Sequence, residues 1–511
     1  MSTDPVVALL AEETNRRFEA RGDDPAIDWQ GQRLSFRALG QRVAAERERL
    51  RTLLPGDGRA LRVGVHAPDG IANLVSGLAL MFEGHTQAIV PLSATPVERR
   101  SLAWRFQLTQ LLAAPERTDA AMADGPVDVL GGSSEGWQLV GLPPWTTVAT
   151  RMDAEEQPGT PADGPVALLA TTSGTTTGRP AVHGVTFQRL LSLLTGLDWS
   201  PYDLLDTTLL GEGLQDHSTR LFKLRCLLQG RGIVIRRLEQ AVEADAFEAG
   251  CNGSPLTPYR LRDLHRRGEL ARWPRGFLCL SGADHIPMEL RRAVQGLGTV
   301  GLGITYATSQ SGPLTWLPPE ELLNEEESLG KPLPNVTVNP LQPMRMERGG
   351  LPFHEVVISK RMRFRRPEAD GTLVEACTVL ENFQPGDLLA RSPTGALIFA
   401  GRSNDVFLFR SLLISPFEIE QVLSQRPEVL ECLAFGAPSP SHGAVPMAAV
   451  VLRSHRDGEA TALLVESLRR ACQVQLGVRS PKKIVVLHDL PRGATGKPLR
   501  RVLAEAHAMK G

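Results

Sequence analysis

A short loop rich in hydroxyl groups is the first part of this chain whose residues could do chemistry. Seven small residues, Thr171 to Thr177, follow the apolar run Val166 to Ala170 and are closed by Gly178. The apolar run is too short for a helix and is typical of a buried strand. Glycines let the backbone bend close to a ligand, and backbone N–H groups with threonine hydroxyls can surround phosphate oxygens. The segment therefore predicts a strand leading into a polyphosphate-binding loop, although its composition also fits a surface linker.

Two common nucleotide-binding motifs are excluded for this loop. No Gly-Lys-Ser or Gly-Lys-Thr ends it, as a Walker loop requires, and no Gly-x-Gly-x-x-Gly follows the strand. The segment instead resembles the phosphate-binding motif of the adenylate-forming superfamily, which includes acyl- and aryl-CoA synthetases, luciferases and carrier-protein adenylation domains. That motif usually reads Ser-Gly-Thr-Thr-Gly-x-Pro-Lys; this chain has one extra threonine, and Ala181 stands where the lysine would be. The resemblance implies ATP contacts from Thr172, Ser173, Gly174, Thr175, Thr176, Thr177 and Gly178.

Two later segments resemble the superfamily's adenine and α-phosphate motifs. Gly282 and Ala283 match a turn whose backbone lies beside the adenine and the acyl group. Further on, the superfamily reads Tyr-Gly-x-Thr-Glu, and this chain reads Tyr-Ala-Thr-Ser-Gln from Tyr306 to Gln310. The resemblance implies that the ring of Tyr306 lies under the adenine and that the Ser309 hydroxyl approaches the α-phosphate. Gln310 replaces the carboxylate that faces Mg²⁺, which keeps an oxygen ligand but loses the charge that a hard cation favours.

The C-terminal third carries the remaining nucleotide motifs. Gly-Asp at Asp387 resembles the superfamily's Thr-Gly-Asp, whose carboxylate binds the ribose hydroxyls, although an aspartate after Pro-Gly is also ordinary turn chemistry. Arg402 matches an arginine on the ribose, and Asn404 matches the hinge that joins the two domains; Asn tolerates unusual backbone angles. Near the C-terminus, Lys497 matches a lysine that bridges the substrate carboxylate and the α-phosphate.

The acid-binding residues leave two substrate classes open. His217 lies fifteen residues before Gly232, the spacing at which acyl-activating relatives carry a histidine that gates the carboxylate pocket. Asp216 begins the pattern Asp-His-Ser, which also matches the Asp-x-Ser that holds the α-ammonium group in amino-acid-activating relatives. Gly301 and Gly303 are typical of a roomy acid pocket, but glycines also arise from close strand packing. We favour an acyl or aryl acid and keep an amino acid as the alternative.

The elements that must position these residues follow an α/β pattern. Short apolar strands near residues 26–29, 62–66 and 88–92 alternate with helical patterns near 36–50, 73–83 and from Pro96 onward. We expect a large N-terminal adenylate-forming domain of βα subdomains with mixed sheets, residues 1–402, which binds ATP and substrate. Residues 403–511 are expected to form a small, mobile α+β domain that carries the Lys497 loop.

Composition bounds the partners. The 511 residues carry a net charge of −1, so neither nucleic acid nor a membrane surface is favoured as a partner. The longest apolar runs fall short of the ~18 residues that span a bilayer. The N-terminus lacks a basic stretch followed by an apolar one, which favours a cytoplasmic location. Six cysteines without metal-ligand spacing are expected to be reduced core residues: Cys226, Cys251, Cys279, Cys377, Cys432 and Cys472.

The resemblance covers almost the whole chain and implies an AMP-forming acid–thiol ligase. A substrate carboxylate would attack the α-phosphate of Mg²⁺-bound ATP, giving an acyl-adenylate and pyrophosphate. The thiol of CoA, or of a phosphopantetheine arm on an acyl carrier protein, would then take the acyl group. A degenerate paralogue that only binds a nucleotide or an acyl group is the alternative, because Ala181, Gln310, Leu408 and Ser411 depart from the motifs. Ser411 replaces a glycine that gives the pantetheine arm room.

Overall fold

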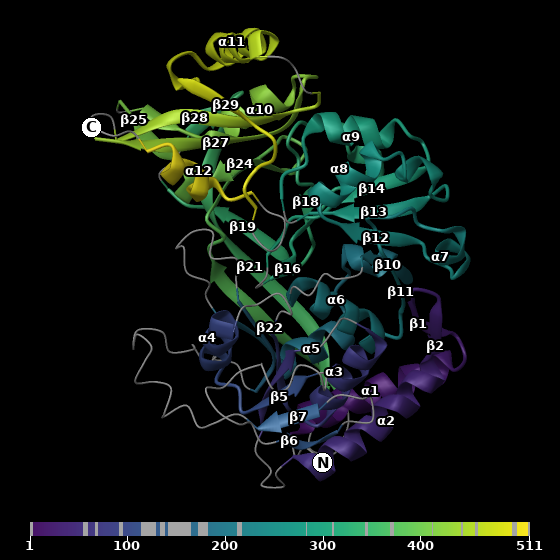
Figure 1. The fold of residues 1–511 in the computed structure, drawn as a ribbon. Coiled ribbons are helices and arrows are strands. Elements are labelled where there is room, and N and C mark those ends of the chain that lie inside the picture. The colour runs from purple at the N-terminus through teal and green to yellow at the C-terminus, as the bar shows by residue number, and fades with distance from the viewer. Residues whose placement is uncertain are drawn as a thin grey trace. The chain divides into compact units, whose positions relative to one another are not determined.

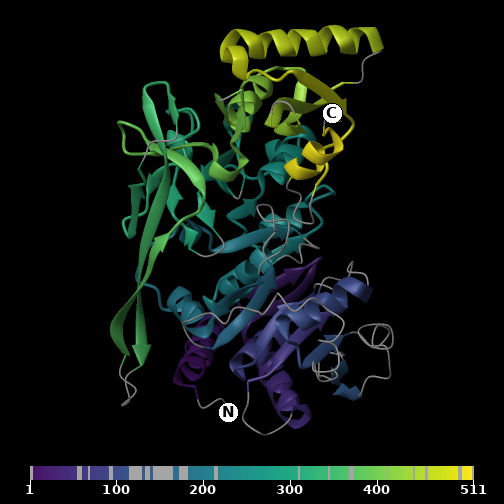
Figure 2. The ribbon, with the colours of Figure 1, turned by 90° about the vertical axis from the view of Figure 1, so that its left-hand side faces the viewer.

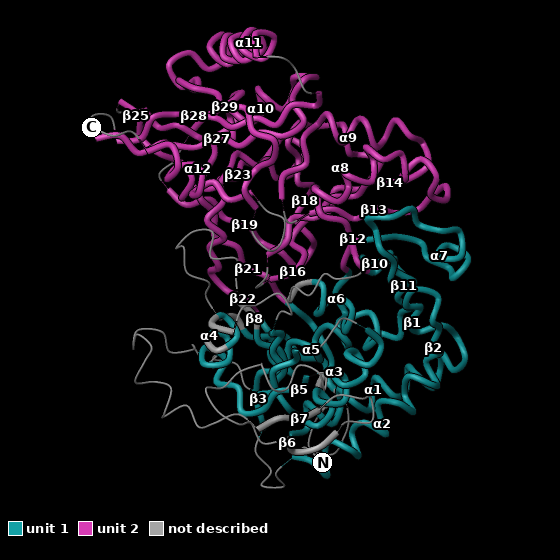
Figure 3. Tube along the Cα trace, in the orientation of Figure 1, with its two compact units in different colours: residues 1–199, 203–254, 362–378 teal, residues 200–202, 255–361, 379–511 magenta. Residues whose placement is uncertain are grey.

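The computed structural model describes most of the chain (Figure 1). The described residues are 4–54, 60–66, 70–90, 96–113, 129–132, 138–141, 165–171, 182–211, 217–282, 284–308, 311–342, 346–367, 373–410, 412–440, 443–454, 458–492 and 498–508. The chain divides into two compact units (Figure 3). Unit 1 comprises residues 1–199, 203–254 and 362–378, and unit 2 comprises residues 200–202, 255–361 and 379–511. The predicted domain boundary after Arg402 falls within unit 2 and stays a prediction.

Unit 1 contains a seven-stranded sheet with the strand order β6-β7-β5-β3-β4-β8-β9. Its four central strands, β5, β3, β4 and β8, are parallel, and the outer pairs are antiparallel. Helices α3 (Ile71–Phe82) and α4 (Pro96–Phe106) connect the parallel strands, as the predicted βα alternation requires. The strands are β3 (Arg62–His66), β4 (Thr86–Ile89), β5 (Gln110–Ala113), β6 (Val129–Gly132), β7 (Gln138–Gly141), β8 (Val166–Thr171) and β9 (Val182–Thr186).

A second group of strands in unit 1 pairs in the order β2-β1-β11-β10. The pairs β1–β11 and β10–β11 are parallel, and β1–β2 is antiparallel. These strands are β1 (Pro25–Trp29), β2 (Gln32–Ser35), β10 (Thr207–Gly211) and β11 (Gly232–Arg236). Helix α6 (His217–Leu228) connects β10 to β11. The buried carboxylate of Asp28 binds Arg236 at 2.7 Å, which ties β1 to the end of β11.

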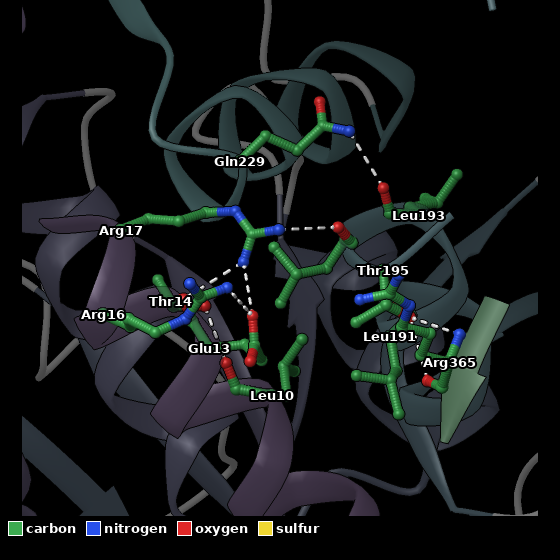
Figure 4. Close-up of polar contacts among 11 residues, drawn as sticks. Leu10, Glu13, Thr14, Arg16, Arg17, Leu191, Leu193, Thr195, Gln229 and Arg365 are labelled. Carbon is green, nitrogen blue, oxygen red and sulfur yellow. Dashed lines mark hydrogen bonds and ion pairs between the residues drawn. The ribbon is translucent and has the colours of Figure 1, made fainter. Parts of the chain in front are cut away.

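Helices α1 (Pro5–Arg21), α2 (Phe36–Leu53) and α5 (Phe187–Leu194) pack on the core of unit 1. Each begins at a polar cap: the side chains of Asp4, Ser35 and Thr186 accept backbone N–H groups of the first turn. Polar contacts then tie α1 to the end of α5 (Figure 4). Arg17 binds both Glu13, at 2.9 Å, and the carbonyl oxygen of Leu194, at 3.1 Å.

Residues 258–304 of unit 2 form a segment of alternating helices and strands that leads to Tyr306. Parallel strands β13 (Phe277–Ser281) and β14 (Val300–Ile304) are joined through α9 (Met288–Gln295), and α8 (Pro258–Arg266) precedes them. A second sheet has the order β19-β21-β23-β24. Its strands are β19 (Val336–Pro340), β21 (Leu351–Pro367), β23 (Asp387–Arg391) and β24 (Leu397–Arg402), with β20 (Met346–Arg348) and β22 (Leu373–Phe383) paired to β21. The boundary between the units runs inside β12 (Gly253–Leu256), β21 and β22.

The C-terminal part of unit 2 is a five-stranded sheet with helices. Strands β26, β25, β28 and β27 follow one another, and β29 adds in parallel to β28. The strands are β25 (Phe407–Phe409), β26 (Leu412–Ile414), β27 (Val429–Ser439), β28 (Gly443–Leu452) and β29 (Lys483–Leu487). The helices are α10 (Pro416–Ser424), α11 (Gly458–Leu476) and α12 (Arg500–Ala506). Figure 2 shows the long helix α11 lying across this sheet. The α+β character predicted for this region is confirmed.

Two sequence predictions about surface and core can be checked here. No helix among the described residues is long and apolar enough to cross a bilayer. Four cysteines are buried and Cys432 is partly buried, but Cys377 on β22 is exposed, so the prediction that all six are core residues is wrong for Cys377. Its strand alternates exposed and partly buried residues. Whether a side chain on such a strand is exposed depends on its position in the alternation, and the apolar character of the thiol does not decide it.

Candidate nucleotide-binding site

Three of the predicted nucleotide-binding residues meet in unit 2. Asp387 begins β23 and Arg402 ends β24, and the antiparallel register places the two residues opposite each other. Arg402 Nε lies 3.4 Å from Oδ1 of Asp387, and the hydroxyl of Tyr306 donates a hydrogen bond to Oδ2. Asp387 is buried, whereas the Arg402 side chain is 45% exposed. The arrangement presents one buried carboxylate, one half-exposed guanidinium and one aromatic ring within a single cluster.

The electrostatics of this cluster keep its donors and acceptors in fixed roles. Burial raises the pKa of Tyr306 far above its usual value, and the neighbouring charge of Asp387 raises it further. The phenol therefore stays protonated at every physiological pH and acts as a donor to Asp387. An ionised carboxylate accepts up to about four hydrogen bonds, which is the chemistry needed to hold two adjacent hydroxyl groups of a ribose.

Backbone contacts hold Tyr306 where β14 ends. The N–H of Tyr306 donates to the Thr315 hydroxyl at 3.1 Å, and its carbonyl oxygen accepts from Leu314 N–H at 2.8 Å. Next to it, Thr305 N–H donates to the carbonyl oxygen of Ser281 at 3.0 Å. A Cβ atom on Gly282 would lie 2.4 Å from the carbonyl oxygen of Thr305, so only glycine lets the chain leave β13 this close to Tyr306. Ala283, the second predicted residue of this turn, lies outside the described residues.

The glycines of β14 take part in packing. A Cβ atom on Gly303 would lie 2.2 Å from the ring of Trp316, and one on Gly301 would lie 3.2 Å from Pro319. The space beside Gly303 is thus filled by an indole ring. These contacts give both glycines a packing role, and their predicted place in the acid pocket stays a prediction.

The predicted phosphate loop joins two neighbouring antiparallel strands of unit 1. The predicted strand Val166 to Ala170 is confirmed as β8, and Thr171 pairs with Val182 at the end where the loop leaves the sheet. The loop residues Thr172 to Gly178, and Ala181, lie outside the described residues. Their predicted contacts with phosphate therefore stay predictions.

The histidine predicted at the acid pocket begins a helix. His217 is the first residue of α6, while Asp216 lies outside the described residues. One helical turn further on, Arg220 is 5% exposed; it donates to Gln87 Oε1 at 2.6 Å and to the side chain of Asn73. The sequence reasoning missed this buried cation. Its only sequence signal was an arginine within a helix that is otherwise mostly apolar on its buried side.

Two predicted catalytic or metal-binding positions are known only through their neighbours. Lys497 lies outside the described residues, but the ends of its loop are joined: Leu499 N–H donates to the Pro491 carbonyl oxygen at 2.7 Å, and Arg492 bridges Pro498. Ser309 and Gln310 also lie outside the described residues. Among the residues that are described, no group of three or more His, Cys, Asp or Glu side chains could hold a metal ion.

The predicted hinge lies in a short helical turn. Asn404 is the middle residue of the 3-10 turn Ser403–Asp405, directly after Arg402 and β24. Ser403 N–H donates to the Gly386 carbonyl oxygen at 2.9 Å, and Asp405 pairs with Arg500 at 3.3 Å. The turn is therefore held on both sides of Asn404, and its role as a hinge stays a prediction. Beyond it, Leu408 on β25 is exposed opposite Leu413, and Ser411 lies outside the described residues.

Comparisons with known proteins agree with this architecture. Residues 14–348 match the family model of the AMP-binding enzymes, and residues 418–497 match that of the AMP-binding enzyme C-terminal domain. The sulfoacetate–CoA ligase of Cupriavidus necator is 27% identical over 474 residues, which cover 87% of each chain. A 2-succinylbenzoate–CoA ligase of Listeria monocytogenes is 29% identical over 208 residues, which cover 40% of each chain.

Similarity to a solved structure extends over the whole fold. The o-succinylbenzoate CoA synthetase of Bacillus subtilis superposes with a TM-score of 0.67 at 19% identity, covering 98% of this chain and 99% of that one. The predicted α/β fold class, with a large N-terminal domain and a C-terminal domain, is confirmed. Because the first family model spans more than half of the chain, the protein belongs to the AMP-binding enzymes of the adenylate-forming superfamily.

Proposed function

We propose that this protein is an AMP-forming acid–CoA ligase that activates a small carboxylic acid as its acyl-adenylate. The observation that carries the proposal is the cluster of Asp387, Arg402 and Tyr306, which supplies a carboxylate and a guanidinium beside an aromatic ring in a chain of this family. This combination suits a ribose and its adenine. The curated relatives reported above are named as CoA ligases, which supports CoA as the acceptor.

The proposed reaction has two steps, formation of an acyl-adenylate and transfer of the acyl group to CoA. A carboxylate oxygen of the acid attacks the α-phosphorus of ATP, so one P–O bond forms and the bond to pyrophosphate breaks. The CoA thiolate then attacks the acyl carbon, and AMP leaves. We assign Lys497 to charge neutralisation at the α-phosphate, the loop from Thr172 to Gly178 to the phosphate oxygens, and His217 to the acid pocket. Such catalysis depends mainly on positioning and electrostatic stabilisation.

Mg²⁺ would enter this site with ATP. Gln310 offers a neutral oxygen, and the described residues supply no carboxylate cluster for a metal. Mg²⁺ usually keeps several waters and binds through substrate phosphates in such sites. The ion would neutralise phosphate charge, while the residues of this chain hold the ribose, the adenine and the acid.

The substrate is proposed to be an acyl or aryl acid. The two curated relatives are named for sulfoacetate and 2-succinylbenzoate, and both names denote acids with a second acidic group. These two acids therefore head the panel to be tested, followed by benzoate, short aliphatic acids and α-amino acids. Asp216 would matter most if an α-ammonium group must be held, and His217 would matter most for an acid without one.

The decisive experiment measures acid-dependent release of pyrophosphate from ATP across this panel, first without and then with CoA. We expect release with at least one non-amino acid, and formation of AMP and the matching acyl-CoA when CoA is added. His217→Ala should then lower the rate more than Asp216→Ala. Release with α-amino acids alone would reverse the proposed substrate class. No release with any acid, in a protein that still binds ATP, would contradict the enzyme and support a nucleotide-binding paralogue. Acyl transfer to a phosphopantetheinyl carrier protein but not to CoA would replace the acceptor.

A further inference from the structure

Charged residues from three distant segments of unit 2 meet on helix α8. Glu431, on β27, accepts one hydrogen bond from Arg262 of α8 at Oε1 and another from Arg492 at Oε2. The ring of Tyr259, one helical turn before Arg262, lies under the Arg492 guanidinium, with 4.7 Å between the guanidinium carbon and the ring centroid. We call Tyr259, Arg262, Glu431 and Arg492 the α8 clamp.

The α8 clamp differs from an ordinary surface ion pair. The Glu431 side chain is 11% exposed and that of Arg492 is 15% exposed, so both charges are largely removed from water. One carboxylate that bridges two guanidiniums makes charge-assisted hydrogen bonds on both of its oxygens. Tyr259, by contrast, is 46% exposed, and its visible contact is the face that it offers to Arg492. An arginine stacked on an aromatic face is a favourable and directional contact.

The clamp joins the two regions that match separate family models. Tyr259 and Arg262 lie within residues 14–348, matched by the AMP-binding enzyme model. Glu431 and Arg492 lie within residues 418–497, matched by the C-terminal domain model. The contact is thus a specific junction between the two family domains. Arg492 belongs to the segment that carries Lys497, whereas Tyr259, Arg262 and Glu431 belong to none of the motifs described above.

Arg492 also stands at the base of the loop that carries Lys497. Its backbone bridges Pro498, and the neighbouring Leu499 N–H donates to the Pro491 carbonyl oxygen at 2.7 Å. Because these bonds join the two ends of the loop, a contact that fixes Arg492 fixes both ends. Glu431 and Tyr259 hold Arg492 by its charge and by its flat face at once.

We propose that Tyr259 and Arg262 are positioning residues for acyl-adenylate formation: α8 is the platform on which the base of the Lys497 loop docks. The inference rests on the proposed function for its kinetic consequence. A lysine can stabilise charge at the α-phosphate only from a defined place, and a misplacement of about 1 Å can cost on the order of 10²-fold in rate. The α8 clamp would fix the position of the loop base without contacting the substrate.

A second ion pair between the same two family domains offers a matched control. Arg453, which follows β28, binds Glu289 of α9 at 2.6 Å, with side chains that are 43% and 44% exposed. This pair has neither the shared carboxylate nor the aromatic platform, and it does not contact the loop base. Exposed pairs of this kind contribute little. Arg453→Ala therefore reports what a general weakening of the domain junction does.

The test uses the full-length protein and two assays of the same variants. Tyr259→Ala and Arg262→Ala leave Glu431 paired with Arg492, so the C-terminal fold keeps this largely buried charge pair. We expect each to lower kcat for acid-dependent pyrophosphate release by about 10-fold or more, with the KM for ATP changed less than about 2-fold. Conversion of supplied acyl-adenylate to acyl-CoA should be retained. Tyr259→Phe, which keeps the aromatic face, and Arg453→Ala should both stay close to the unmodified protein.

Hydrogen exchange separates failure of the clamp from failure of the proposed function. In the protein without substrates, Tyr259→Ala with Arg262→Ala should speed exchange of the Leu499 amide, and Arg453→Ala should not. Faster exchange in a protein that releases no pyrophosphate with any acid would uphold the docking and overturn the function. Unchanged exchange, or pyrophosphate release equal to that of Arg453→Ala, would overturn the clamp. An equal fall in both half-reactions would also overturn it, because it would indicate a purely structural role.

Discussion

Two carboxylates in unit 2, the buried Asp387 and the partly buried Glu431, bind arginines, yet they join very different parts of the chain. Asp387 and Arg402 face each other on neighbouring strands, so the sheet register alone brings them together. Glu431 binds Arg262 and Arg492, which are 169 and 61 residues away in sequence. We propose the first carboxylate as a ribose-binding group that is already held in place without the nucleotide. The second carboxylate joins the C-terminal region to α8. Substitutions near Asp387 should therefore change nucleotide binding, and substitutions near Glu431 should change the rate of the reaction.

The largest expected effect tests that separation at Lys497. Lys497→Ala should reduce pyrophosphate release by ~10²–10³-fold, because one well-placed charge contact to a transition state is commonly worth about 3–4 kcal/mol. ATP binding, measured by calorimetry, should be largely retained because Tyr306 and Asp387 are untouched. The exposed Lys483→Ala on β29 is the matched control. An equal loss of acyl-CoA formation from supplied acyl-adenylate would show that the loop is needed for both steps or for folding.

A stability effect of similar size is expected at the buried Glu327. Burial by itself would raise the pKa of Glu327, but the charge and hydrogen bond of His285, with a hydrogen bond from Gln421, outweigh it and lower the pKa to about 2. The folded pKa lies below the unfolded value, so this carboxylate stabilises the fold above about pH 4.5. That contribution, roughly 3 kcal/mol, should be lost as the pH falls from about 4.5 through 2.

Denaturant unfolding of the protein between pH 6 and pH 2.5 measures this dependence. Glu327→Gln should flatten the acid limb of the stability curve. Arg469 also lowers the pKa of Glu466, but that side chain is exposed, so Glu466→Gln should change the slope much less. Gln421 lies on α10. The same measurement therefore tests whether the contacts of Glu327 with His285 and Gln421 stabilise the C-terminal region in addition to the α8 clamp. An acid limb with the same slope in the Glu327 variant would contradict the assignment.

Substitutions in the cluster of Tyr306, Asp387 and Arg402 should have smaller effects, and these should appear as a weaker affinity for ATP. Asp387→Ala removes the acceptor of both Tyr306 and Arg402, and we expect the Kd for ATP to rise about 10- to 100-fold, since hydrogen bonds to charged groups contribute about 1.5–3 kcal/mol. Tyr306→Phe keeps the ring and removes one donor, so about a 5-fold rise is expected. If both variants instead lowered only kcat, the cluster would belong to the chemistry and the comparison drawn above would fail.

The smallest effect is expected for the metal. Gln310→Glu restores a charged oxygen ligand and should lower the Mg²⁺ concentration for half-maximal pyrophosphate release by about 2- to 5-fold, because hard cations favour carboxylates. Gln310→Ala provides the comparison without an oxygen ligand. An identical Mg²⁺ requirement in all three proteins would mean that residue 310 does not face the ion.

Much of the fold and the nucleotide cluster followed from the sequence itself. The strand β8 followed from a short apolar run, α2 from apolar residues at helical spacing, and the start of α4 from a proline placed where a first helical turn tolerates it. Tyr306, Asp387 and Arg402 were each found by a motif. Their meeting could not be read from the chain, since it depends on the pairing of β23 with β24 and on the hydrogen bonds that hold Tyr306 after β14.

Tertiary structure alone decided the features that have no local signal. The sequence did not show what lies beside Gly303, and the structure places the ring of Trp316 in the space where a Cβ atom would stand. The sequence analysis singled out no role for Arg220, and only the packing of α6 places it against Asn73 and Gln87. In the α8 clamp, Tyr259 and Arg262 lie one helical turn apart, but Glu431 and Arg492 come from distant segments at separations that follow no helical or strand period. Contacts between distant segments depend on how whole helices and strands pack against one another. The types and spacing of neighbouring residues in the sequence do not determine that packing.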